Sequence, residues 1–194
     1  MKSDMLQKAR QAAGEILSKE RFFHTECVAR EAKALAECYG EDVCAAEAAG
    51  YLHDIAKEMS RGDLLQMLGR SAIIDVDEIR NCPPVWHAYA GGVYAREMLS
   101  ARDDIVSAIS SHTTGSADMS NLQKIIFLAD YISEDRDFDF LDDIRALAYK
   151  SLDEAVVSVI ERQILFLMNR RSYVDINMIR AYNDLVLKGE NQTV

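Results

Sequence analysis

The chain has 194 residues, of which 49% are hydrophobic and 28% are charged, with only 9 glycines and 2 prolines. This length and composition are typical of one helix-rich globular domain that buries a core of its own, and they argue against a disordered chain. The formal net charge of −10 repels nucleic acid and anionic membranes, and no block of lysine or arginine is long enough to offset it. We therefore expect no nucleic-acid and no membrane partner.

The N-terminal stretch "MKSDMLQKARQAAGEIL" lacks the apolar segment of a secretory signal, and no apolar run in the chain is long enough to span a bilayer. The cysteines form no C-x-x-C pair and do not stand at zinc-finger spacing from a histidine. They are interpreted as reduced thiols. The sequence therefore predicts a cytoplasmic protein.

Apolar residues recur with helical periodicity along almost the whole chain, and no segment alternates as a β-strand does. Gly40 suits the residue after a helix, Pro83 and Pro84 suit the start of one, and the Ser-x-x-Gln pattern at 120–123 is a capping box. The fold class is expected to be all-α, with a single domain over residues 1–194. The predicted helices cover 4–19, 22–39, 42–58, 61–69, 75–81, 85–100, 102–112, 120–134, 140–168 with a break near Tyr149, and 175–188.

The third predicted helix carries polar residues where its apolar face should continue. His53 falls on the apolar stripe, Asp54 follows it about 100° round the helix, and Lys57 lies one turn further on. The apolar positions of that stripe are Ala45, Ala49, Leu52 and Ala56. A second predicted helix places Asp130 on its stripe, where a carboxylate is costly unless it is paired or binds a cation.

A single histidine on an apolar face is usually a hydrogen-bonded core residue. This chain has four histidines, and the other three, His24, His87 and His112, each stand near the end of a predicted helix. Imidazoles together with carboxylates are the ligands that divalent Fe, Mn, Co and Zn accept. No two histidines have H-x-x-x-H spacing, so the sequence does not indicate a zincin.

His24, the His53-Asp54 doublet and Asp130 follow the H…HD…D pattern of the HD-domain metal-dependent phosphohydrolases, and His87 and His112 fit the longer form of that pattern. Within that superfamily the chain most resembles the YqeK family, whose members hydrolyse diadenosine tetraphosphate symmetrically and use iron. The segment "ISEDR" at 132–136 departs from the Glu and Pro expected there, although Arg136 keeps the basic position. The matching segments are "RFFHT" at 21–25, "LHDIAK" at 52–57, "PPVWHAYAGG" at 83–92, "SSHTTG" at 110–115 and "KIIFLADYIS" at 124–133.

The resemblance implies a single HD-type helical domain and an iron site, although other divalent transition metals also suit these ligands. The site would hold either one ion or two; in the second case His87 and His112 hold the second ion, and Asp54 bridges the two. In either case a bound ion would activate the water that cuts the substrate into two ADP. If only one ion binds, His87 and His112 contact a substrate phosphate instead. The implied metal ligands are His24, His53, Asp54 and Asp130; the implied catalytic residues are Asp54, Lys57, His87 and His112; the implied substrate contacts are Arg21, Lys57, His87, His112, Thr113 and Arg136.

Several alternatives stay open at the level of sequence. The same kind of site could act on a deoxynucleoside monophosphate, a cyclic nucleotide or ppGpp. The chain could also be a non-catalytic nucleotide-binding sensor, although every ligand position of the pattern is filled. A helical scaffold with incidental histidines is the last alternative. The resemblance also makes a homodimer an expectation.

Overall fold

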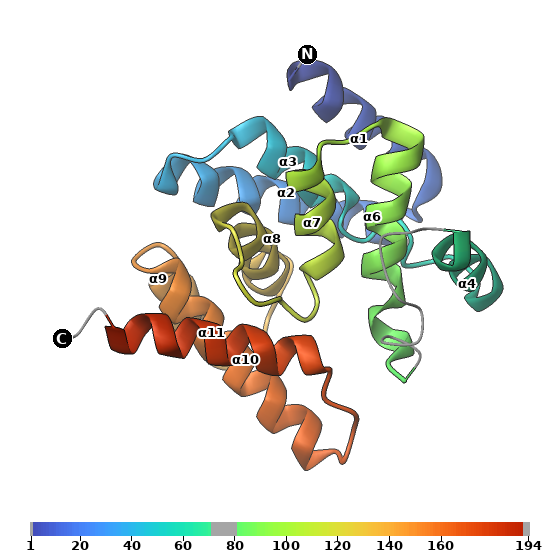
Figure 1. Cartoon of the computed structure of the whole chain (residues 1–194). Coiled ribbons are helices and arrows are strands. Elements are labelled where there is room, and N and C mark those ends of the chain that lie inside the picture. The colour runs from blue at the N-terminus through green and yellow to red at the C-terminus, as the bar shows by residue number, and fades with distance from the viewer. Residues whose placement is uncertain (1, 71–80, 192–194) are drawn as a thin grey trace.

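A computed structural model describes residues 2–70 and 81–191 of the chain. Every regular element among these residues is a helix, so the all-α prediction is confirmed (Figure 1). The helix predicted over 75–81 lies, except for its last residue, outside the described residues. The elements are α1 (Lys2–Ile16), α2 (Lys19–Tyr39), α3 (Val43–Leu52), α4 (Arg61–Arg70), the 3₁₀ helix η1 (Pro83–Val85), α6 (Trp86–Leu99), α7 (Asp103–Ser111), α8 (Asn121–Ile132), α9 (Leu141–Ala148), α10 (Leu152–Asn169) and α11 (Ile176–Asn191).

The helix boundaries follow local signals in the sequence. Ser120 and Gln123 form the expected capping box at the start of α8, and Gly40 ends α2 in the left-handed region with φ of 69°. The predicted break near Tyr149 is confirmed, because α9 ends at Ala148 and α10 begins at Leu152. The first helix ends and the second begins about three residues before the predicted positions. The reason is that the Ser18 hydroxyl accepts a hydrogen bond from the backbone N–H of Arg21 and caps α2.

The third helix is shorter than predicted. It was expected over 42–58, yet α3 ends at Leu52, and the backbone continues as turns in which Lys57 N–H donates to the Asp54 carbonyl. The cause is the side chain of His53, whose Nδ1 lies 2.7 Å from the Gly50 carbonyl oxygen. In a continuing α-helix that oxygen would accept from the N–H of Asp54. His53 thus ends the helix and fixes its own ring by the same hydrogen bond.

The helix α3 lies at the centre of the N-terminal part, packed against α1, α2 and α7, while α8 packs against α2, α7 and α10. Gly50 allows α3 to approach α2 closely, because a Cβ atom there would lie 2.6 Å from the Cα of Ala29. This close approach brings the turn after α3 next to the first turns of α2. Side chains from α2, α3, α6, α7 and α8 can therefore meet at one point.

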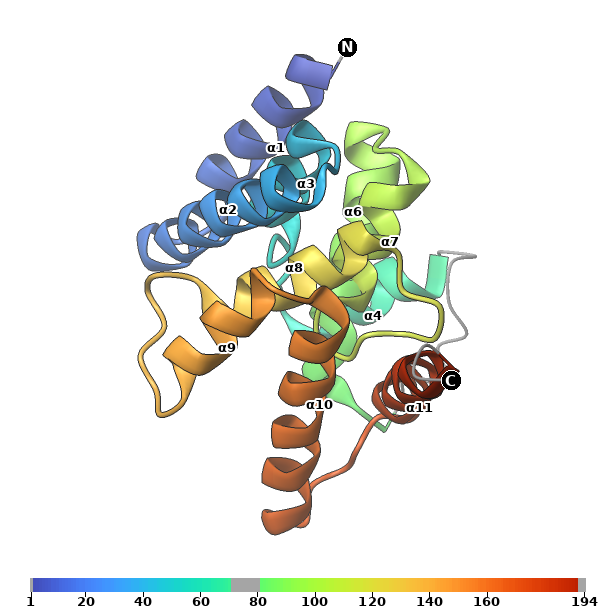
Figure 2. The ribbon, with the colours of Figure 1, turned by 90° about the vertical axis from the view of Figure 1, so that its left-hand side faces the viewer.

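The helices α10 and α11 form a separate layer on the opposite side of the molecule from α1 (Figures 1 and 2). α10 packs on α8 near its beginning and then extends away from the body, as Figure 2 shows. Its far half carries exposed apolar residues such as Leu165, Phe166 and Met168. In the part of the chain that the structure describes, no helix has the length and apolarity needed to cross a membrane.

Candidate metal centre

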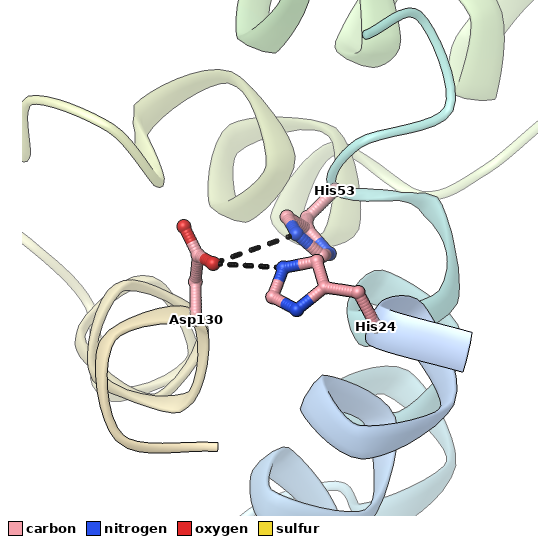
Figure 3. A group of neighbouring side chains, drawn as sticks. All are labelled: His24, His53 and Asp130. Carbon is pink, nitrogen blue, oxygen red and sulfur yellow. Dashed lines mark hydrogen bonds and ion pairs between the residues drawn. The ribbon is translucent and has the colours of Figure 1, made fainter. Parts of the chain in front are cut away.

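Three side chains from distant parts of the chain converge at the first half of the site. His24 comes from the second turn of α2, His53 from the residue after α3, and Asp130 from the last turn of α8 (Figure 3). The Nε2 atoms of His24 and His53 lie 3.1 Å and 3.8 Å from the same oxygen, Oδ1 of Asp130. Their ligand atoms are close enough together to hold one metal ion.

Asp54 lies at the centre of the second half. Its Oδ2 is 3.6 Å from Nε2 of His53, and its Oδ1 is 3.2 Å from Nε2 of His87 and 3.7 Å from Nε2 of His112. The carboxylate therefore faces both halves of the site with its two oxygens. His53, Asp54 and His112 form a second group with the spacing of metal ligands, which shares His53 with the first.

Hydrogen bonds at the far side of the rings decide which ring nitrogens face the site. Nδ1 of His53 lies 2.7 Å from the Gly50 carbonyl and Nδ1 of His112 lies 2.7 Å from the Ile109 carbonyl, so both Nδ1 atoms carry the proton. In the neutral ring, Nε2 is then an acceptor with a lone pair. These lone pairs point at carboxylate oxygens, which are acceptors too. Such an arrangement is repulsive unless a cation lies between them.

The buried polar atoms support this interpretation. Among the described residues, Nε2 of His53 and Oδ1 of Asp54 are buried and have no hydrogen-bond partner. Buried polar groups are nearly always paired, so two orphaned acceptors at one point need an explanation. A divalent cation provides one, since imidazole nitrogens and carboxylate oxygens are its usual ligands. The donor set therefore fits a metal ion.

The environment also sets the protonation states that a metal requires. Burial lowers the pKa of His53 to about 4, so its ring is neutral near pH 7. Burial alone would raise the pKa of Asp54 and Asp130, but the neighbouring imidazoles hold both below the ordinary value. Burial opposes protonation of His24 as well, but its hydrogen bonds to Asp130 and Asp135 raise its pKa. Binding of a metal at His24 then requires release of a proton.

Each predicted basic residue of the site lies against one of these candidate ligands. Nη1 of Arg21 is 3.0 Å from Oδ2 of Asp54, and Nη2 of Arg136 is 2.5 Å from Oδ1 of Asp130. Nζ of Lys57 is 3.0 Å from Nε2 of His87 and 3.6 Å from Oδ1 of Asp54. The Lys57 side chain is 38% exposed, so it reaches both the centre and the solvent.

A hollow opens beside the centre, which we call the His87 hollow. It has a volume of about 440 Å³, and its inner wall contains Lys57, His87 and Thr113. The hydroxyl of Thr113 is buried and has no hydrogen-bond partner among the described residues. The outer wall is largely apolar and includes Phe166 and Tyr173 near the turn between α10 and α11. The structure therefore brings together every side chain that the sequence marked as a site residue.

One residue at this site was missed by the reasoning from sequence. Oδ2 of Asp135 lies 2.7 Å from Nδ1 of His24, and Oδ1 of Asp135 accepts from the hydroxyl of Ser133 over 2.7 Å. Both residues belong to the segment "ISEDR", which departs from the family pattern. That departure was the available signal, although nothing in it showed which histidine Asp135 would meet.

Comparisons with known proteins agree with this geometry. The HD domain model matches residues 21–135, which include all four histidines. A relative from Halalkalibacterium halodurans is 35% identical, with 93% of this chain and 97% of the relative aligned, and one from Bacillus subtilis is 34% identical, with 88% and 91% aligned. Both are symmetrical bis(5'-nucleosyl)-tetraphosphatases by name. The crystal structure of a predicted HD superfamily hydrolase involved in NAD metabolism from Clostridium acetobutylicum superposes with a TM-score of 0.89 at 30% identity, covering 94% of this chain and 97% of that one. The chain therefore belongs to the HD-domain family, among relatives that are symmetrical bis(5'-nucleosyl)-tetraphosphatases.

Proposed function

We propose that this chain hydrolyses diadenosine tetraphosphate symmetrically and releases two ADP. One observation in the structure carries the proposal: His53 Nε2 and Asp54 Oδ1 are orphaned acceptors beside a hollow that Lys57 and Thr113 line. A cation site and a phosphate-binding wall thus share one place. The names of the relatives that cover most of this chain support the same substrate.

The residues that would hold the metal are His24, His53, Asp54 and Asp130, and HD-domain membership implies dependence on a divalent metal. Iron is the metal we propose, in keeping with the family resemblance. A second ion would take His87 and His112, with Asp54 shared between the two positions. When bound, the metal supplies Lewis acidity and a nucleophilic water at neutral pH.

The chain's own groups bind and orient the substrate. Lys57 places its ammonium group at the mouth of the centre, where it neutralises charge on the phosphate that reacts. The orphaned hydroxyl of Thr113 donates to a neighbouring phosphate oxygen. Arg21 and Arg136 add two guanidinium groups, one against the Asp54 carboxylate and one against the Asp130 carboxylate. One nucleoside fills the apolar outer part of the His87 hollow.

This arrangement sets which bond breaks. If the His87 hollow holds a nucleoside and Thr113 and Lys57 hold its phosphates, the phosphorus over the centre is an inner one. The leaving group is then the other nucleoside diphosphate. Two ADP result from one cut in the middle of the tetraphosphate.

Product analysis tests the proposal. Purified protein without a histidine tag is assayed with diadenosine tetraphosphate, and its products are separated by chromatography at early times while its metal content is measured on the same sample. Two ADP per substrate and at least one transition-metal ion per chain are expected.

Equal amounts of ATP and AMP would contradict the proposed position of the cut. No cleavage, together with turnover of a nucleoside monophosphate, a cyclic nucleotide or ppGpp, would assign the site to a different HD reaction. Tight binding without any turnover would point to a sensor. The homodimer and the cytoplasmic location stay predictions from the sequence.

A further inference from the structure

A second hollow adjoins the His87 hollow along α10. It has a volume of about 380 Å³ and is lined by Tyr131, Phe138, Asp139, Arg162, Gln163 and Phe166, which we call the aromatic hollow. Three of the six lining residues are aromatic. No group of the candidate metal centre lines it, and no predicted site residue does.

Two residues of the aromatic hollow are close in sequence to residues of the metal centre. Tyr131 directly follows Asp130 at the end of α8. Phe138 lies two residues after Arg136, whose guanidinium is hydrogen-bonded to Asp130. The Arg136 side chain is 38% exposed, so this cation can meet a ligand from solution.

The two hollows share a wall made by Gln163 and Phe166 of α10. The side-chain oxygen of Gln163 is buried and has no hydrogen-bond partner among the described residues. An unpaired amide oxygen in a shared wall is poised to accept a hydrogen bond from a ligand. The aromatic hollow therefore adjoins the His87 hollow through Gln163 and Phe166, and Tyr131 in its wall follows the candidate metal ligand Asp130 in the chain.

The lining of the aromatic hollow suits a nucleoside. The rings of Tyr131 and Phe138 meet edge to face with centroids 4.9 Å apart, a geometry that aromatic rings prefer. Phe138 and Phe166 are 39% and 58% exposed, although large apolar side chains are usually covered. Aromatic faces stack on nucleic-acid bases without strong preference for one base. The carboxylate of Asp139 can accept from ribose hydroxyls.

We infer that the aromatic hollow binds the second nucleoside of the dinucleoside tetraphosphate, the one that departs with the leaving diphosphate. This inference rests on the proposed function and extends it. Each nucleoside then has a hollow of its own, and the polyphosphate passes over the metal centre between them. A site for each nucleoside holds the substrate by both ends, which favours a cut in the middle of the tetraphosphate.

The test compares two substrates that differ only in the second nucleoside: diadenosine tetraphosphate and adenosine 5'-tetraphosphate. Wild-type protein should have the higher kcat/KM for the dinucleotide. Phe138→Ala should raise KM for diadenosine tetraphosphate by about tenfold, the loss expected for one stacking interaction. The same variant should leave KM and kcat for adenosine 5'-tetraphosphate unchanged, and that unchanged rate also shows that the variant folds. If wild type does not cleave adenosine 5'-tetraphosphate at all, the second nucleoside is essential. The KM for diadenosine tetraphosphate then carries the test, and circular dichroism shows whether the variant folds.

Three further variants make the test specific. Phe138→Trp keeps a stacking face and should keep wild-type KM. Phe138→Leu keeps apolar packing without a π face and should behave like Phe138→Ala, which preserves the test if the alanine variant does not fold. Leu165→Ala removes an apolar side chain of α10 that is 61% exposed but lines neither hollow, and it should have no effect.

The outcomes separate this inference from the proposed function. If wild type yields two ADP but the Phe138→Ala and Phe138→Leu variants match it, the inference is wrong and the function stands. Equal losses on both substrates would assign Phe138 to folding or to the reacting centre, which also overturns the inference. Equal kcat/KM of wild type for the two substrates would show that no site for a second nucleoside exists. If wild type produces no ADP, the proposed function itself fails.

Discussion

Asp135 and His24 lie 111 residues apart in sequence, yet Oδ2 of Asp135 accepts a hydrogen bond from Nδ1 of His24 over 2.7 Å. The side chain of Asp135 is 18% exposed, and Ser133 fixes its other oxygen. This is the arrangement in which a carboxylate fixes the ring orientation of a metal-binding histidine and raises its basicity. Asp135 would therefore position His24 as a ligand without itself binding the metal.

Replacing Asp135 should weaken metal binding. Loss of such a supporting carboxylate typically costs about 10–100-fold in metal affinity or activity, and we expect a loss of that size for Asp135→Ala. Asp135→Asn keeps an acceptor oxygen for the His24 N–H and should retain more of the affinity. Competition against a chelator measures the affinity directly. The control is Asp142→Ala, since that side chain is 96% exposed. If Asp135→Ala bound the metal as tightly as wild type does, Asp135 would not position His24.

Asp54→Ala should abolish nearly all turnover. Asp54 is 3% exposed and lies within 3.7 Å of His53, His87 and His112, so its loss removes the proposed ligand that is common to both halves of the site. The loss should exceed the roughly 100-fold upper figure for supporting residues. Turnover and metal content are measured together. A folded variant that keeps its metal and more than about a tenth of the wild-type rate would show that Asp54 has been assigned wrongly, since a lost supporting residue alone costs about that much.

The sequence was informative about the fold because helix signals are local. The capping box at Ser120, the left-handed Gly40 and the break near Tyr149 depend on a few neighbouring residues each, and all three were predicted. The end of α3 was not predicted, because it depends on a side-chain hydrogen bond from His53 that competes with the helix backbone. Apolar periodicity continues through that point and carries no sign of the competition.

The residues of the candidate site also fall into those that the sequence could predict and those that it could not. His24, His53, Asp54 and Asp130 could be found because their order matches a family pattern, and their positions on apolar stripes pointed independently to His53 and Asp130. Asp135 could not be assigned, since its partner His24 lies far away in the sequence, on α2. The aromatic hollow is likewise assembled from the segment after α8 and the middle of α10. Exposed aromatics such as Phe138 and Phe166 carry no pattern in the sequence that distinguishes them from surface residues.

Lys57→Ala should lower kcat on diadenosine tetraphosphate and leave metal content unchanged. Its ammonium group lies 3.0 Å from His87 Nε2 at the inner wall of the His87 hollow, where charge on the reacting phosphate increases. Removing one such electrostatic group costs about 100- to 1000-fold in kcat in well-studied cases. Lys57→Arg keeps the charge and should retain part of the rate. The control is Lys33→Ala, an exposed lysine on α2 outside the cluster. A change in KM alone would show that Lys57 only binds substrate.

The pH dependence of stability offers a test that needs no substrate. Burial holds the pKa of His53 at about 4 in the folded, metal-free chain, against 6.5 for an ordinary histidine. Between these values the unfolded chain binds a proton that the folded chain does not, so stability falls as the pH falls from 6.5 towards 4. For His53 alone the loss is roughly 3 kcal/mol in the free energy of unfolding.

A comparison with His53→Gln isolates this contribution. Burial also lowers the pKa of His87, which adds to the loss, whereas the pKa of His24 is raised by its carboxylate partners and acts in the opposite direction. Both remain in the variant, so the difference between the two proteins reports His53. Urea unfolding of chelator-treated protein at several pH values from 7.5 to 4.5 measures it. Wild type should lose more stability on acidification than His53→Gln, and parallel curves would mean that the buried ring of His53 does not stay neutral in the folded chain.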